Sequence, residues 1–216
     1  MKQKTPDDVP HAQKQRVISY VDGFNLYFGL KAGGWSRFYW LNVSKLSENL
    51  LLSSQELVTT KYFTSRIAAP PDKVKRQTLF IEATQESTKA ELIFGQYFQT
   101  PFKCPLCAGT DRVPTEKMTD VNIATEMLTD AFQDRFDTAL LISADSDLLA
   151  PVKAIRRLFP EKRIVVAFPP NRTSDMLKQS ASAHIFIGKH TLAASLLPEK
   201  ITKRDGYVIE RPTRWK

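Results

Sequence analysis

The chain has 216 residues, of which 42% are hydrophobic, and it carries a formal net charge of +8. This suits one soluble domain with extensions, and no apolar run approaches the roughly 20 residues of a membrane-spanning helix. The polar, proline-containing start lacks the pattern of a secretion signal, and two cysteines are too few for a disulfide framework. We therefore expect a cytoplasmic protein, whose basic surplus favours polyanionic partners such as nucleic acid.

Predicted strands and helices alternate along the first half of the chain. Apolar and β-branched runs predict strands over 16–22, 56–66 and 92–100. Helices are expected from Phe24 to the glycines at 33–34, from an Asn42 cap to about residue 52, and over 73–90. The stretch 101–117, which holds both cysteines, is expected to be irregular.

The alternation continues in the second half. Strands are predicted over 138–142, 163–168 and 184–187, and helices over 119–132, 148–159 and 174–183. From residue 198 the chain is polar and basic, and an Asp205-Gly206 turn would close a weak hairpin there. Strands that alternate with helices indicate an α/β fold, with a mostly parallel sheet covered on both faces.

Four aspartates fall at predicted strand ends or helix starts. Asp22 ends the first strand, and Asp145 and Asp147 follow the apolar strand at 138–142. Asp120 opens the helix at 119–132, on the face that carries Ile123 and therefore points toward the sheet. The carboxyl ends of parallel strands share one edge, where ligands bind in α/β proteins. The four carboxylates are therefore expected to converge.

Carboxylates brought together in this way repel one another unless a cation is present. An oxygen-only ligand set suits Mg²⁺ or Mn²⁺, which can activate water for attack on a phosphodiester. A helix cap is the alternative interpretation for Asp120 or Asp147 taken singly, but it leaves Asp22 and Asp145 unexplained. Glu126, on the opposite helix face, is expected to be a solvated charge.

Three motifs in order resemble the NYN domain, a family of the PIN-like nuclease superfamily, in the group related to the cyanobacterial protein LabA. They are Val21-Asp-Gly-Phe-Asn25, Glu116-Lys117 leading into Thr119-Asp-Val-Asn-Ile-Ala124, and Ser143-Ala-Asp-Ser-Asp-Leu148. The resemblance implies a Rossmann-like, three-layer α/β/α sandwich over residues 16–190. A disordered tail at 1–15 and a basic extension at 191–216 would flank this domain.

The resemblance also implies a Mg²⁺- or Mn²⁺-dependent ribonuclease. Its metal-binding and catalytic acids would be Asp22, Asp120, Asp145 and Asp147. Its substrate-binding or accessory groups would be Asn25, Lys117, Ser143 and Ser146. Related chains often carry an acid near the last strand, where this one has His184, and glycine where it has Ala144. A catalytically weak or inactive RNA-binding or regulatory module is therefore the alternative.

Basic and aromatic residues point to single-stranded RNA as the partner. Arg172 follows a strand on the same sheet edge as the acids, where it would hold a phosphate. The loop at 35–40 mixes aromatic residues with Arg37, which suits either base stacking or local packing. Cys104 and Cys107 form one knuckle without a second cysteine pair, so no zinc site within one chain is predicted. A shared site in a homo-oligomer, or the remnant of a lost site, is left open.

Overall fold

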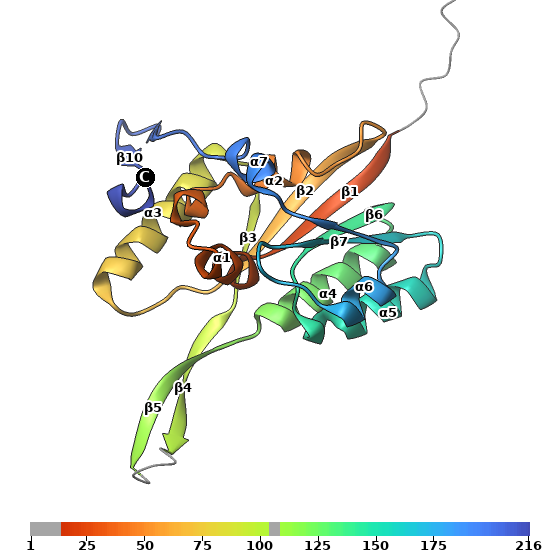
Figure 1. The fold of residues 1–216 in the computed structure, drawn as a ribbon, viewed down its shortest axis with the longest axis horizontal. Helices are drawn as coiled ribbons and strands as arrows, with labels where there is room; N and C mark the ends of the chain where they lie inside the picture. Colours follow the sequence, from red (N-terminus) through yellow and green to blue (C-terminus); the bar gives the residue numbers. More distant parts are fainter. Residues whose placement is uncertain (1–13, 104–108) are drawn as a thin grey trace, which may run out of the picture.

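The computed structural model describes residues 14–103 and 109–216. Its centre is a six-stranded sheet in the order β3-β2-β1-β6-β7-β8, in which all neighbours are parallel (Figure 1). The strands are β1 (Gln15–Asp22), β2 (Gln55–Thr64), β3 (Glu91–Phe94), β6 (Thr138–Ile142), β7 (Arg163–Phe168) and β8 (Ala183–Phe186). The chain order runs outward from the middle in both directions, so it reverses between β1 and β6.

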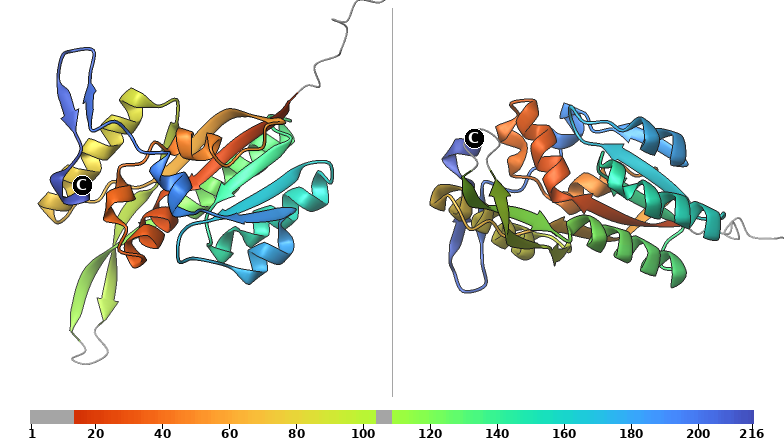
Figure 2. Two further views of the ribbon diagram at one scale, coloured as in Figure 1. Left: turned by 45° about the horizontal axis from the view of Figure 1, so that its top comes forward. Right: turned by 90° about the horizontal axis from the view of Figure 1, so that it is seen from below.

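Helices cover both faces of this sheet (Figure 2). Alternate residues of β1 point to opposite faces, so Ile18 packs in one apolar core and Val17 in the other. The first core includes residues of α4 (Thr119–Phe132), α5 (Leu149–Leu158) and α6 (Asp175–Ser180). The second includes residues of α1 (Gly23–Ala32), α2 (Val43–Glu48) and α7 (Lys189–Ala193). The predicted three-layer α/β/α sandwich is confirmed.

Local signals in the sequence account for several element boundaries. The Asn42 side chain accepts a hydrogen bond from the Lys45 amide and caps α2, as predicted. Helix α3 (Pro71–Ser87) begins with a proline, whose missing amide hydrogen costs nothing in a first turn. Helix α6 is shorter than predicted, because its chain is already extended at Ala181.

The segment after β3 differs from the prediction. The single strand expected over 92–100 is broken at Gly95, and β4 (Gln96–Lys103) pairs instead with β5 (Thr110–Lys117). These two strands form an antiparallel hairpin that projects from the body, where an irregular stretch was expected (Figure 1). Gly95 is required at the break, because a Cβ there would crowd Glu116 and lie 2.5 Å from the Ser65 hydroxyl. The cysteine knuckle at 104–107 lies outside the described residues.

The C-terminal segment packs against the domain. Strands β9 (Lys200–Thr202) and β10 (Val208–Glu210) form the predicted hairpin, with Gly206 at a φ of +86° in its turn. The segment shares a small core with α3, which includes Trp40, Ala83 and Ile209. The Arg211 guanidinium donates to the Arg37 carbonyl, and so ties this end to the short helix η1 (Ser36–Tyr39). Among the described residues, no helix is long and apolar enough to cross a membrane.

Candidate metal centre

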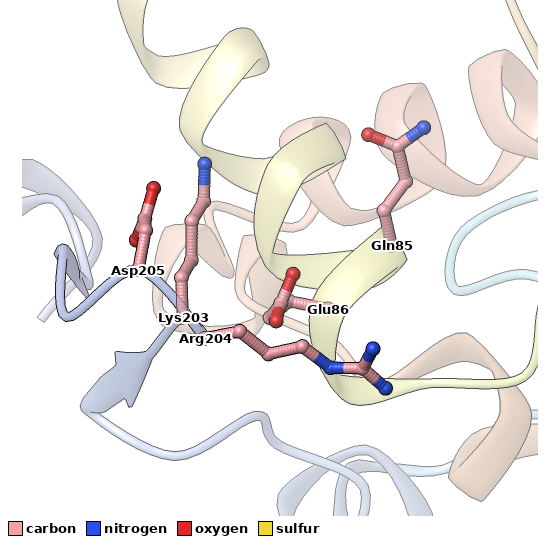
Figure 3. A pocket seen from close by; sticks show the side chains of 5 residues that line it. All are labelled: Gln85, Glu86, Lys203, Arg204 and Asp205. Atoms are coloured by element: carbon pink, nitrogen blue, oxygen red, sulfur yellow. The ribbon is translucent and has the colours of Figure 1, made fainter.

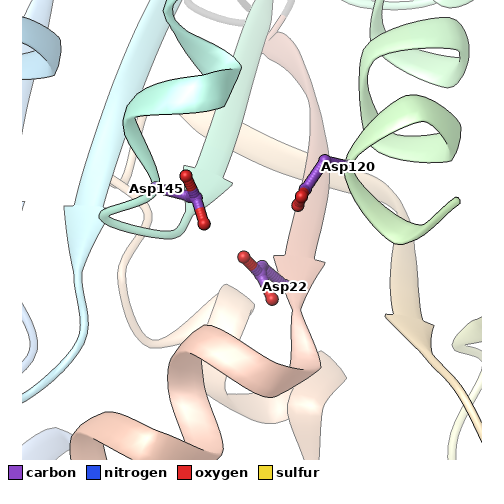
Figure 4. Close-up of side chains that lie close together, drawn as sticks. All are labelled: Asp22, Asp120 and Asp145. Carbon is purple, nitrogen blue, oxygen red and sulfur yellow. The ribbon is translucent and has the colours of Figure 1, made fainter. Parts of the chain in front are cut away.

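Asp22, Asp120 and Asp145 converge at one edge of the sheet. Each offers one carboxylate oxygen, and these oxygens all lie within 4.8 Å of one another (Figure 4). Asp22 is the last residue of β1, Asp120 lies in the first turn of α4, and Asp145 precedes the short helix η2 (Ser146–Leu148) after β6. The group, which we call the acid triad, thus lies where the strand order reverses, the usual ligand position in such sheets.

Hydrogen bonds fix two of these acids relative to each other. Asp22 accepts from the Asn25 amide and from the Ser143 hydroxyl, both at 2.9 Å. The Ser143 oxygen in turn accepts from the Asp145 amide at 3.0 Å. The Asn25 side chain accepts from the Ala144 amide, also at 3.0 Å. The start of α1 and the loop after β6 are therefore joined into one unit.

A close approach of the backbone holds Asp22 in place. Gly23 follows it, and a Cβ at that position would lie 2.6 Å from both the Phe63 carbonyl oxygen and the Tyr62 hydroxyl. Only glycine lets α1 begin so close to β2. Burial, together with the charge of Asp22, raises the pKa of Tyr62 above its ordinary value. The sequence interpretation did not include Tyr62, since nothing in a buried strand marks one tyrosine as a neighbour of the site.

Asp120 is positioned by the turn between β5 and α4. Met118 has a φ of +81°, a left-handed conformation that is uncommon for a residue other than glycine and is concentrated at functional sites. The Glu116 carboxylate accepts from the Ser65 hydroxyl at 2.9 Å and from the Thr119 hydroxyl, and so fastens the turn to β2. Glu116 is a further acid near the triad, since its charge raises the pKa of Asp120. Its place in the second motif was the feature of the sequence that could have identified it as a residue of the site.

Burial and the repulsion between carboxylates raise the pKa of two acids of the triad, Asp22 and Asp120. Burial, with the charge of Asp145 acting in the same direction, raises the pKa of Asp22 to about 6. The hydrogen bonds from Asn25 and Ser143, and the charge of Arg172, oppose that rise. Burial and then the charges of Asp22 and Asp145 raise the pKa of the half-buried Asp120, also to about 6. A cation at this position would favour the ionised form of all three acids.

The other predicted residues lie at varying distances from the triad. Asp147 is exposed and outside the group of three; its amide donates to the Asp145 carboxylate at 3.0 Å, and its charge raises the pKa of Asp120. Arg172 is close enough for its charge to lower the pKa of Asp22. Ser146 and Lys117 are exposed. His184 contacts the rings of Phe168 and Phe186 on the outer strands.

A second charged cluster corrects one expectation. Glu126 is not a free surface charge, because its carboxylate lies 2.5 Å from the ammonium of Lys61, whose side chain is only 1% exposed. The same ammonium lies 2.7 Å from the fully buried Asp130. Asp130 also accepts from the Tyr20 hydroxyl and from the Arg135 guanidinium. We call these five residues the Lys61 network.

Two hollows lie outside the triad. One, of about 460 Å³, lies between α3 and the β9–β10 turn and is lined by polar side chains of both signs (Figure 3). Its Lys203 already pairs with Glu82 at 2.8 Å. The other, of about 490 Å³, borders the aromatic loop. In that loop Phe38 and Trp40 are buried, as the local-packing alternative requires. Trp35, Arg37 and Phe38 line the hollow.

Comparisons with known proteins show the family and the fold of this chain. The NYN domain model matches residues 16–188. The chain is 27% identical to the 6-hydroxy-3-succinoylpyridine 3-monooxygenase HspA of Pseudomonas putida, over 93% of this chain and 75% of that protein. The crystal structure of a protein of unknown function from Vibrio parahaemolyticus superposes with a TM-score of 0.55 at 19% identity, and covers 88% of this chain and 100% of that one. The Vibrio structure shows a shared fold.

Proposed function

Because the chain belongs to the NYN domain family of the PIN-like superfamily, we propose that it is a ribonuclease that uses Mg²⁺ or Mn²⁺. The observation that carries the proposal is the acid triad, whose carboxylate oxygens lie within 4.8 Å of one another although they come from three separate elements. This donor set fits a hard divalent cation, which prefers oxygen ligands and a few carboxylates. When bound, such an ion can activate water and stabilise the charge that develops on a phosphodiester.

The residues around the triad would position its acids and bind the substrate. Asn25 and Ser143 hold Asp22 and the Asp145 loop in one geometry. The Arg172 guanidinium, which already acts electrostatically on Asp22, would bind a phosphate oxygen of the substrate. The exposed Asp147, Ser146 and Lys117 would contact the RNA strand, or water molecules bound to it, at the edge of the site. The net charge of +8 favours RNA, and single-stranded RNA in the cytoplasm is the proposed substrate.

Paired substitutions test this chemistry. Asp145→Asn combined with Asp147→Asn should lower Mn²⁺-dependent cleavage of single-stranded RNA more than about 100-fold. Mutation of a residue that only hydrogen-bonds to a metal ligand already lowers metal affinity or activity by about 10–100-fold. The control is Asp175→Asn, in which an acid with an 83% exposed side chain on α6 is changed. Calorimetric titration with Mn²⁺ should show uptake by the parent and the control but not by the double variant. Cleavage that survives the double change would rule the assignment out.

An RNA-binding module without catalysis is the second candidate. His184, at a place where related chains often have an acid, contacts Phe168 and Phe186 and does not join the triad. The Mn²⁺ titration separates the candidates: a binding module takes up no metal through Asp22 and Asp145, yet it still binds RNA.

The Pseudomonas relative motivates a third candidate. Its name makes it a 3-monooxygenase of 6-hydroxy-3-succinoylpyridine, and the alignment covers 93% of the present chain. Oxygen consumption in the presence of that pyridine and a reductant would support a monooxygenase. Consumption that is no faster than with denatured protein would exclude this reaction.

A further inference from the structure

The hollow beside the aromatic loop combines cations with an aromatic ring. It has a volume of about 490 Å³, and its lining includes Trp35, Arg37, Lys189, His190 and Lys216. Among the residues that the structure describes, no Asp or Glu lines it. Its residues come from the turn after α1, from η1, from α7 and from Lys216. The fold thus collects positive groups from well-separated segments around one concave surface.

Two of these cations have no acidic partner in the part of the chain that the structure describes. Neither Arg37 nor Lys189 forms an ion pair within the described ranges 14–103 and 109–216, whereas Lys216 lies 3.7 Å from Glu199. The Lys189 ammonium lies 4.7 Å from the centre of the Trp35 ring, and the Arg37 guanidinium lies 4.9 Å from that of Phe38. Unpaired cations beside a partly exposed indole suit a ligand that has both a phosphate and a flat ring.

Helix α1 connects this hollow to the acid triad. Asp22 caps the beginning of α1, and Gly33 caps its end, next to Gly34, which lines the hollow. Ten residues at 1.5 Å each make the helix about 15 Å long. Arg172 lies beside the helix between these ends, since a Cβ at Gly29 would be 3.5 Å from its Cδ atom. Positive groups are therefore available part-way along the helix as well as at its far end.

We propose that the hollow binds one nucleotide of the single-stranded RNA, a few positions away from the phosphate at the triad. The base would stack on Trp35, and the phosphate would lie between Arg37 and Lys189. This inference rests on the proposed ribonuclease function, and it adds the site that sets how long a substrate must be.

Binding without cleavage tests the site directly. A fluorescently labelled single-stranded RNA of twelve nucleotides is titrated with the full chain in EDTA at several salt concentrations. Arg37→Gln with Lys189→Gln should weaken binding about tenfold. It should also reduce the slope of the logarithm of the binding constant against the logarithm of the salt concentration by about 0.7, the contribution of one neutralised phosphate on a single strand. The control is Arg163→Gln, which removes an exposed charge at the start of β7, the opposite end of the sheet. An unchanged affinity and slope in the double variant would overturn the proposal.

The ring is tested separately. Trp35→Leu should weaken binding about tenfold or more, whereas Trp35→Phe should keep most of it, because stacking contributes about 1–3 kcal/mol per base. Thermal unfolding checks that both variants fold. RNA should quench tryptophan fluorescence in the parent but not in Trp35→Phe, since Trp40 and Trp215 are buried. Equal affinity in the Leu variant would exclude stacking on Trp35.

Substrate length separates this proposal from the proposed function. A dinucleotide is too short to span about 15 Å, so Arg37→Gln with Lys189→Gln should raise KM for the dodecamer and leave KM for the dinucleotide unchanged. If the parent shows cleavage that depends on Asp145, but Arg37→Gln with Lys189→Gln binds RNA normally, the nucleotide site in the hollow is rejected and the ribonuclease function is kept. If the parent cleaves nothing but the pocket variant loses RNA affinity, the ribonuclease assignment fails and the pocket stands. A parent that binds no RNA overturns the pocket.

Discussion

The two charged clusters of this protein lie on the same elements but are built in opposite ways. Helix α4 carries Asp120 in its first turn and Asp130 near its end, and β1 carries Asp22 and Tyr20. In the Lys61 network, the Asp130 carboxylate receives hydrogen bonds from Lys61, Tyr20 and Arg135. In the acid triad, three carboxylates face one another, and their direct hydrogen bonds come from backbone amides and one hydroxyl.

The contrast separates a structural cluster from a binding one. A buried charge is stable when its partners are in place, and the Lys61 network supplies them from the chain itself. The triad is left with negative charge that the chain does not match, as the raised pKa values of Asp22 and Asp120 show. A bound cation would neutralise this charge and favour the ionised carboxylates. The predictions below test this difference, starting with the largest effect.

Breaking the Lys61 network should unfold the protein more easily. Asp130→Asn leaves the Lys61 ammonium buried with Glu126 alone, and we expect a loss of about 3–5 kcal/mol in the free energy of unfolding. Urea denaturation measures the loss. The control Glu126→Gln changes a side chain that is 35% exposed, and it should lose about 1 kcal/mol. A loss below 1 kcal/mol for Asp130→Asn would show that the network is not structural.

A divalent metal should stabilise the protein through the triad alone. At about 100 times its dissociation constant, Mn²⁺ should add about 2.7 kcal/mol, because only the folded state brings the three acids together. Thermal unfolding with and without Mn²⁺ measures this. Asp145→Asn should lose the added stability, while Glu126→Gln should keep it. Equal stabilisation of both variants would mean that the metal binds elsewhere.

The sequence allowed most of the sandwich to be predicted, and part of the site. Apolar runs marked β1, β6 and β7, and the shared edge of parallel strands placed Asp22 and Asp145 together. Contacts between charged residues far apart in the sequence could not be predicted in this way. Lys61 contacts Asp130, 69 positions further along, and no periodic pattern announces that contact. The β4–β5 hairpin was missed because its β4 side chains are largely exposed, so no alternation of burial shows in the sequence.

The pH dependence of stability tests the raised pKa of Asp22 in the acid triad. Asp22 has a folded pKa of about 6 against an ordinary 3.8, so the folded state holds its proton more tightly than the unfolded one. Without metal, stability is therefore greatest below about pH 4 with respect to this group and falls as the pH rises to 6. Asp22→Asn should reduce the fall between pH 4 and 7 by about 2 kcal/mol, measured by urea denaturation in EDTA. An unchanged pH profile would contradict the raised pKa.

The smallest expected effect concerns the support of Asp22. The Ser143 hydroxyl donates to its carboxylate, and this bond lowers the pKa of Asp22. Ser143→Ala removes a bond of about 1 kcal/mol, so the Asp22 pKa should rise by a further ~0.5–1 unit. Because metal ligands must be deprotonated, the pH midpoint of Mn²⁺ uptake should rise by the same amount. Ser146→Ala, whose hydroxyl is exposed three positions along, should leave the midpoint unchanged. A midpoint that moves equally in both variants would show that Asp22 does not control metal uptake, and the triad would then have to bind its ion through Asp120 and Asp145.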